Sequence, residues 1–71
     1  MKSKKIQIVI NGEKKIIAGN QNLLCLLSIL KLKSNSIAIE INKEVIPKSL
    51  YYKTIVREKD KIEILQFIGG G

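Results

Sequence analysis

The sequence predicts an α+β domain, a roll in which a mixed sheet of four to five strands packs on one α-helix. Three observations lead to this prediction. Two stretches of alternating polar and apolar residues meet at Asn11-Gly12, one segment carries leucines at helical spacing, and two more alternating stretches follow. A chain of 71 residues has room for one such domain, which we place at residues 1–68, with a glycine tail at residues 69–71.

The first two strands are predicted to form a hairpin over residues 5–18. The stretch KIQIVI alternates with a period of two, so one face of the strand carries Ile6, Ile8 and Ile10, and the other carries Val9. Asn11-Gly12 tolerates the positive φ angles of a type I′ turn, and EKKIIA then returns as the second strand.

A helix is predicted in the stretch NLLCLLSILK. Its core stripe has the spacing i, i+3, i+4, i+7, occupied by Leu23, Leu26, Leu27 and Leu30. Asn22 precedes the stripe and is a good N-cap residue, because its side chain can accept a hydrogen bond from the first turn.

Two later stretches, IAIEIN and KIEILQF, alternate again and predict strands. Between them, Pro47 excludes a central strand and indicates a short edge segment that leads into an irregular turn around Leu50 and Tyr51. The first and last strands are expected to be parallel neighbours at the centre of the sheet. The helix would cover one face, and the open face would carry a small apolar patch made of Val9, Ala38, Leu65 and Phe67.

This patch is the predicted partner-binding surface. An exposed apolar group that leads into the chain's last residues is more plausibly a docking site than a packing error. We assign Phe67, Leu65, Ile68 and Val9 to it, with nearby lysines steering the protein toward acidic rims on its partners.

The chain is strongly basic, with 13 Lys and Arg residues against six Asp and Glu residues and a net charge of +7. Such a charge attracts nucleic acid, anionic membranes or acidic proteins. The lysines are scattered, however, and aromatic residues are only 4% of the chain, so stacking platforms for bases are lacking. A solvated surface is the favoured interpretation, and a small basic RNA-binding module stays open as an alternative.

Cysteine and histidine usage argues against metal binding and against catalysis. Cys25 is the single cysteine and there is no histidine, so no internal disulfide, metal site or histidine acid–base pair is expected. The apolar stretch after MKSKK is too short for a signal peptide, and no run could span a bilayer. We expect no membrane association and a cytoplasmic location, or the stroma of an organelle if the gene is encoded there.

The sequence closes on QFIGGG. Glycine has no side chain to pack and loses more backbone freedom on ordering than any other residue, so Gly69, Gly70 and Gly71 are not expected to serve the core. The prediction is a thin, flexible tail that carries a free carboxylate.

Several blocks together resemble the ThiS family of sulfur carriers in thiamin biosynthesis, which have the β-grasp, ubiquitin-like fold. The blocks are VINGE, AIEINKEVIPKSLY and VREKDKIEILQFIGGG, and the resemblance spans residues 6–71. There are three departures: Lys59 stands where the family usually has glycine, Lys48 where arginine is common, and Tyr51 where tryptophan is frequent. None of them touches the tail.

The resemblance implies a function for the tail. A ThiF-like adenylating enzyme would use ATP and Mg²⁺ to adenylate the carboxylate of Gly71, which would become a thiocarboxylate and donate sulfur to a ThiG-like thiazole synthase. Gly70 and Gly69 would let the carboxylate thread a narrow channel. The carrier would be a monomer when free, would bind no cofactor or nucleic acid, and would be a protein cosubstrate, not an enzyme. The small subunit of molybdopterin synthase, with the same fold and glycine end, stays open as an alternative.

Overall fold

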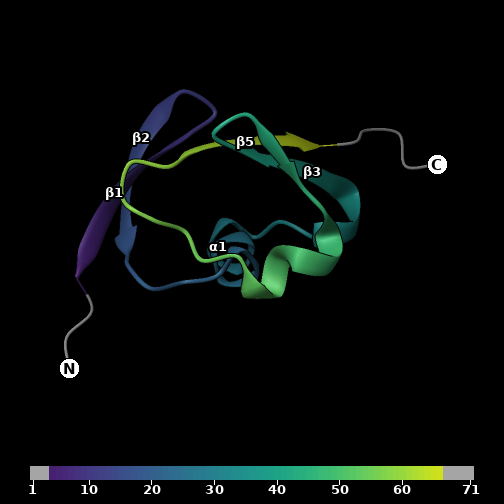
Figure 1. Cartoon of the computed structure of the whole chain (residues 1–71), viewed down its shortest axis with the longest axis horizontal. Coiled ribbons are helices and arrows are strands. Elements are labelled where there is room, and N and C mark those ends of the chain that lie inside the picture. The colour runs from purple at the N-terminus through teal and green to yellow at the C-terminus, as the bar shows by residue number, and fades with distance from the viewer. Residues whose placement is uncertain (1–3, 67–71) are drawn as a thin grey trace.

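The computed structural model describes residues 4–66 as a five-stranded mixed sheet that curves around one α-helix (Figure 1). The strands are β1 (Lys5–Ile10), β2 (Glu13–Ala18), β3 (Ile37–Ile41), β4 (Glu44–Ile46) and β5 (Lys61–Gln66), and the helices are α1 (Leu23–Leu30) and the 3₁₀ helices η1 (Ser34–Ser36) and η2 (Lys48–Lys53). The spatial order is β2-β1-β5-β3-β4. The predicted α+β roll is confirmed, with all five strands present.

The first hairpin forms where Asn11-Gly12 predicts it. Asn11 has φ 49° and Gly12 has φ 85°, the left-handed backbone that a type I′ turn requires, and Lys5 pairs with Ala18 at the open end. Gly19 extends the ladder, since its amide donates to the carbonyl of Lys4 at 2.6 Å. A Cβ on Gly19 would lie 2.8 Å from that carbonyl oxygen, so only glycine fits there without a shift.

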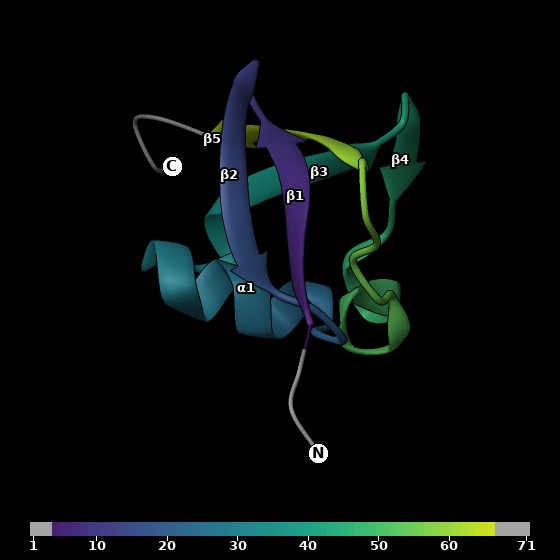
Figure 2. The ribbon, with the colours of Figure 1, turned by 90° about the vertical axis from the view of Figure 1, so that its left-hand side faces the viewer.

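Helix α1 lies across the concave face of the sheet (Figure 2). Three residues of the predicted stripe, Leu23, Leu26 and Leu27, are buried, and the fourth, Leu30, is half-buried and packs against the core. The predicted cap is confirmed, because Asn22 Oδ1 accepts a hydrogen bond from the Cys25 amide at 2.8 Å. The helix ends at Lys31, whose φ of 60° is the left-handed conformation common after helix C-termini.

The core between α1 and the sheet is apolar. It consists of Ile8, Ile10, Leu23, Leu26, Leu27, Ile37, Ile39, Ile41, Tyr51, Val56 and Ile62. Tyr51 comes from η2, where the sequence predicted an irregular turn and the structure has a 3₁₀ helix. Burial raises the pKa of the Tyr51 phenol, and a hydrogen bond with the Ile39 backbone opposes that shift. None of the helices within residues 4–66 has the length and apolar character needed to cross a membrane.

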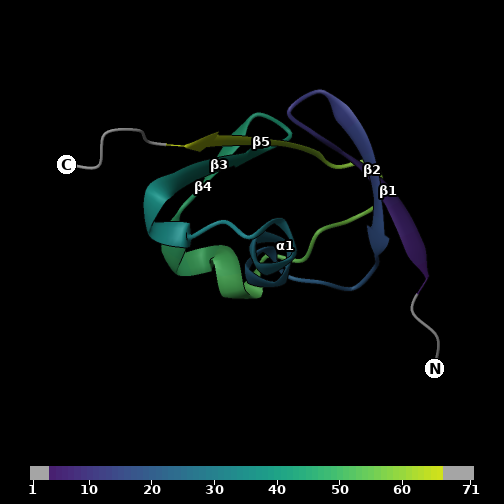
Figure 3. The ribbon, with the colours of Figure 1, turned by 180° about the vertical axis from the view of Figure 1, so that it is seen from behind.

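The central strand β5 has unequal neighbours. It pairs with β3 antiparallel from Ile37↔Gln66 to Ile41↔Ile62, but its parallel pairing with β1 is confined to Val9↔Lys61 and Ile10↔Ile62. The expected parallel contact of the first and last strands is therefore confirmed, although it is short. Seen from behind, β3 and β4 lie on one side of β5 and the β1–β2 hairpin lies on the other (Figure 3).

The start of β5 is fastened to the β3–β4 turn by Asn42 and Asp60. Asn42 Nδ2 donates to Asp60 Oδ1 at 3.0 Å, and the Lys61 amide donates to Asn42 Oδ1 at 3.0 Å. Asp60 Oδ2 also accepts from the Arg57 amide at 2.8 Å. We refer to Asn42 and Asp60 as the β5 clamp, because their side chains tie two loops to the first residue of the strand.

Lys59 occupies a left-handed position with φ 70°, and its amide donates to the Gln7 carbonyl at 2.8 Å. This conformation explains why glycine suits the position: a Cβ costs about 1–2 kcal/mol in the left-handed region. The departure from the family pattern therefore leaves the turn in place but strained.

We predict that Lys59→Gly raises the free energy of unfolding by up to about 1 kcal/mol, because relief of the strain exceeds the added backbone entropy of the unfolded chain. Urea denaturation measures the change. Lys48→Gly is the matched control: it removes the same charge from an exposed residue whose φ is not left-handed, and it should lower the free energy of unfolding. A loss of stability in Lys59→Gly equal to that of the control would contradict the prediction.

Candidate docking site on the open face of the sheet

The face of the sheet opposite α1 carries a small group of apolar side chains on the neighbouring strands β5, β3 and β4. Leu65 is 65% exposed, and its Cα partner on β3 is Ala38. One row along, Val45 on β4 is 66% exposed and is the Cα partner of Glu40. Alternation along the strands places these side chains on the same face, as the period-two pattern of β5 predicted for Leu65.

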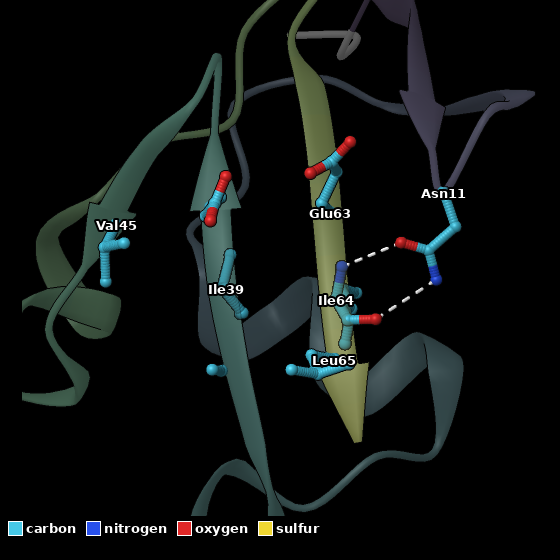
Figure 4. Close-up of a pocket in the computed structure, with 8 residues that line it drawn as sticks. Asn11, Ile39, Val45, Glu63, Ile64 and Leu65 are labelled. Atoms are coloured by element: carbon cyan, nitrogen blue, oxygen red, sulfur yellow. Dashed lines mark hydrogen bonds between the residues drawn. The ribbon is translucent and has the colours of Figure 1, made fainter. Parts of the chain in front are cut away.

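These residues line a shallow groove of about 460 Å³ (Figure 4). Its lining consists of Asn11, Ala38, Ile39, Glu40, Val45, Glu63, Ile64 and Leu65. We refer to it as the β5 groove. Val45 was not among the residues predicted for this surface, because the sequence pattern assigns no face to the three-residue strand β4. The antiparallel pairing of β4 with β3 supplies that face.

Val9 lies elsewhere on the same face. Its partner on β5 is Lys61, four residues before Leu65, which is a separation of about 13 Å along the strand. On its other side Val9 pairs with Lys14 of β2. The structure therefore brings Ala38 and Leu65 together but does not bring Val9 to them, and the surroundings of Val9 are basic.

The side chains that border Leu65 are acidic. Glu63 and Glu40 are Cα partners on β5 and β3, and both line the β5 groove. Lysines therefore lie beside Val9, one of the residues assigned to the predicted surface, whereas carboxylates flank the groove. Sequence alternation gives the face of a residue but not its neighbour on the adjacent strand, which depends on register.

Asn11 supports the strand that forms the groove. The Ile64 amide donates to Asn11 Oδ1 at 2.8 Å, and Asn11 Nδ2 donates to the Ile64 carbonyl at 3.2 Å (Figure 4). The side-chain amide thus takes the place of a further β1 residue beyond the end of the short parallel ladder. The sequence pattern predicted only a turn at Asn11, not this support of β5.

We predict that Asn11→Gly lowers the free energy of unfolding by about 1–2 kcal/mol, because the turn is kept while two hydrogen bonds to the Ile64 backbone are lost. Urea denaturation measures the loss, and hydrogen exchange should show faster exchange at the Ile64 amide.

Lys31→Gly is the control for this substitution, since it too replaces a left-handed residue, with φ 60°, by glycine. It should leave stability unchanged or raise it. If Asn11→Gly costs no more than the control, the amide does not hold β5.

The remaining predicted site residues, Phe67, Ile68, Gly69, Gly70 and Gly71, lie outside the described residues, as does the boundary at residues 68–69. Within residues 4–66, no group of three or more His, Cys, Asp or Glu side chains is placed to hold a metal ion. The described part of the candidate site comprises an apolar groove, two carboxylates and a supporting amide.

A mixed sheet of this strand order gripping one helix is the β-grasp architecture, and its described strand β5 leads from the centre of the sheet toward the end of the sequence. Residues 8–71 match the model of the ThiS family. The chain belongs to the ThiS family.

Individual relatives agree with this assignment. A solved structure of a thiamine biosynthesis protein (ThiS) from Geobacter metallireducens superposes with a TM-score of 0.81 at 32% identity, covering 93% of this chain and 100% of that one. The sulfur carrier protein ThiS of Bacillus subtilis is 39% identical over 46 residues, or 65% of this chain and 70% of that protein.

A third relative is a longer protein. The thiazole synthase of Paramagnetospirillum magneticum is 41% identical over 66 residues, which is 93% of this chain but only 20% of the relative. This chain thus spans about a fifth of that protein's length.

Proposed function

We propose that this protein is a sulfur carrier in the biosynthesis of the thiazole of thiamin, and that its reactive group is the carboxylate of Gly71. The observation that carries the proposal is the family match, which runs through the β-grasp domain to residue 71. The named relatives support it: one is a sulfur carrier protein, and one is a thiazole synthase in which a similar segment makes up part of the chain.

The proposed chemistry has two steps on partner proteins. A ThiF-like adenylating enzyme joins the Gly71 carboxylate to the AMP of ATP and releases pyrophosphate, with Mg²⁺ held by the enzyme. A sulfur donor then displaces AMP, which leaves a thiocarboxylate, and a ThiG-like thiazole synthase takes the sulfur. Gly69 and Gly70 lack a Cβ, so the chain next to the carboxylate is thin enough for a narrow channel.

In this scheme the carrier supplies binding and presentation, and the enzymes supply the acid–base and metal chemistry. The carrier is a cosubstrate that binds no cofactor of its own, and it is a monomer between encounters. The scheme places it in the cytoplasm, or in the stroma of an organelle if an organelle genome encodes it. Its partner surface is the β5 groove, extended by Phe67 and Ile68.

We predict that incubation with the ThiF-like enzyme of the same organism, Mg²⁺, ATP and a sulfur source replaces one oxygen of Gly71 by sulfur. Mass spectrometry of the intact protein detects the change. Deletion of Gly71, or addition of one residue after it, should abolish the reaction, while Cys25→Ser should leave it intact. Equal modification of the extended variant would show that the terminal carboxylate is not the reactive group.

A second prediction concerns the groove. Because Leu65 is mostly exposed, Leu65→Ala should change the free energy of unfolding by less than about 1 kcal/mol, yet it should weaken binding to the adenylating enzyme by about 1–3 kcal/mol. Phe67→Ala should behave in the same way. Calorimetric titration measures the affinity.

Ile16→Ala is the matched control for Leu65→Ala. Ile16 is 68% exposed and lies on β2, away from the β5 groove, so its removal takes away a similar apolar area at another place. An equal loss of affinity in both variants would mean that the groove is not the docking surface.

A further inference from the structure

Glu40 and Glu63 form a like-charge pair on the open face of the sheet. They are directly opposite one another on the antiparallel strands β3 and β5. Like charges in this arrangement destabilise a sheet. The chain contains only six acidic residues against 13 basic ones, so two carboxylates side by side are unexpected on composition alone.

The described residues do not neutralise this pair. The side-chain hydrogen bonds within residues 4–66 involve Glu58 and Asp60 among the acidic residues, and none of them ends on Glu40 or Glu63. Asp60 is used by the β5 clamp and Glu58 accepts from the Gln7 amide. The two groove carboxylates thus have no comparable structural task in the described fold.

The pair borders an apolar surface. Val45 lies beside Glu40, and Leu65 lies two residues along β5 from Glu63, on the same face. The groove they share is therefore an apolar surface of moderate size with two carboxylates at its edge. A side chain that combines an apolar stem with a cationic head fits both parts.

We propose that the β5 groove receives an arginine or lysine side chain of the adenylating enzyme, whose stem packs on Leu65 and Val45 and whose charged head lies between Glu40 and Glu63. This inference rests on the proposed function. Arginine suits the position best, because its guanidinium can donate to two carboxylates at once and its stem covers apolar surface.

The charges on the rest of the open face favour a single orientation of the bound partner. Lys61 lies two residues before Glu63 on the same face of β5, and Lys14 lies on the far side of Val9. The face therefore changes from basic on the hairpin side to acidic at the groove. A partner with the opposite order of charges binds in one orientation only, since the reverse one brings like charges together.

The test compares Glu40→Gln/Glu63→Gln with the wild type in titrations against the ThiF-like adenylating enzyme at low and at physiological salt. We expect the affinity to fall at least tenfold and its dependence on salt to become weaker. The melting temperature of the free variant should stay the same or rise, because a repulsion is removed. A gain in stability with a loss in affinity separates recognition from a structural role.

The matched control is Glu13→Gln/Glu44→Gln, which removes the same charge from exposed positions. Glu13 pairs with Ile10 and Glu44 with Ile41, so both lie on the other face of the sheet. This variant should keep its affinity within about twofold. An equal loss of affinity in the two variants would show that the effect depends only on net charge, and it would overturn the proposal.

Two other outcomes would also overturn it. A lower melting temperature in the groove variant would show that Glu40 and Glu63 stabilise the fold instead of binding a partner. If light scattering shows that the wild type is an oligomer and the groove variant a monomer, the groove binds a second copy of this chain. The proposed function has a separate test, since it is wrong if the wild type acquires no sulfur. The groove proposal alone is wrong if the wild type and the groove variant acquire sulfur equally at limiting carrier concentration.

Discussion

The position of β5 at the centre of the sheet is the constraint on which the structure depends. One neighbour, β3, pairs with β5 over five residues, but the other, β1, pairs with it at only two positions. Side chains support β5 on both of its edges, the β3 side at its start and the β1 side beyond the short parallel ladder. Asn42 and Asp60 hold the first residue of the strand, and the Asn11 amide bonds both backbone groups of Ile64. An unpaired backbone group at a half-buried position costs about 1–3 kcal/mol, so these contacts decide whether β5 stays in place.

The same asparagines also make the turns. Asn11 has φ 49° and Asn42 has φ 53°, and asparagine tolerates the left-handed region better than most residues. Each therefore performs two tasks, a reversal of the chain and a hydrogen-bonded support for β5. Such double use of a residue suits a small domain, in which few other residues are available to form hydrogen bonds with a central strand. Lys59, with φ 70°, is the opposite case, because none of the side-chain hydrogen bonds within residues 4–66 involves its side chain.

Local sequence patterns predicted the helices and strands of this fold, but they did not predict which residues pair between strands that are distant in the sequence. The hairpin, the leucine stripe and the Asn22 cap follow from short-range spacing, and the faces of Ile62 and Leu65 follow from alternation. The register between β1 and β5 does not follow from such local patterns, because the long connection between the two strands does not fix which of their residues pair. Val9 was therefore assigned to the same patch as Leu65 although it pairs with Lys61. Alternation likewise did not show that Glu40 and Glu63 would lie opposite one another next to Leu65, because that depends on the register of β3 and β5.

The link between the open face and the end of the sequence runs through β5. Leu65 and Glu63 belong to the strand that Asn11 and the β5 clamp fix in the sheet, and residues 67–71 follow that strand directly in the sequence. A partner that binds the β5 groove therefore binds the strand from which those residues start. If β5 could slide by one residue, Leu65 would turn to the core face and the groove would lose its apolar side. The supports of β5 thus stabilise the fold and shape the groove together, because they fix the register that keeps the apolar residue and the carboxylates on the same face.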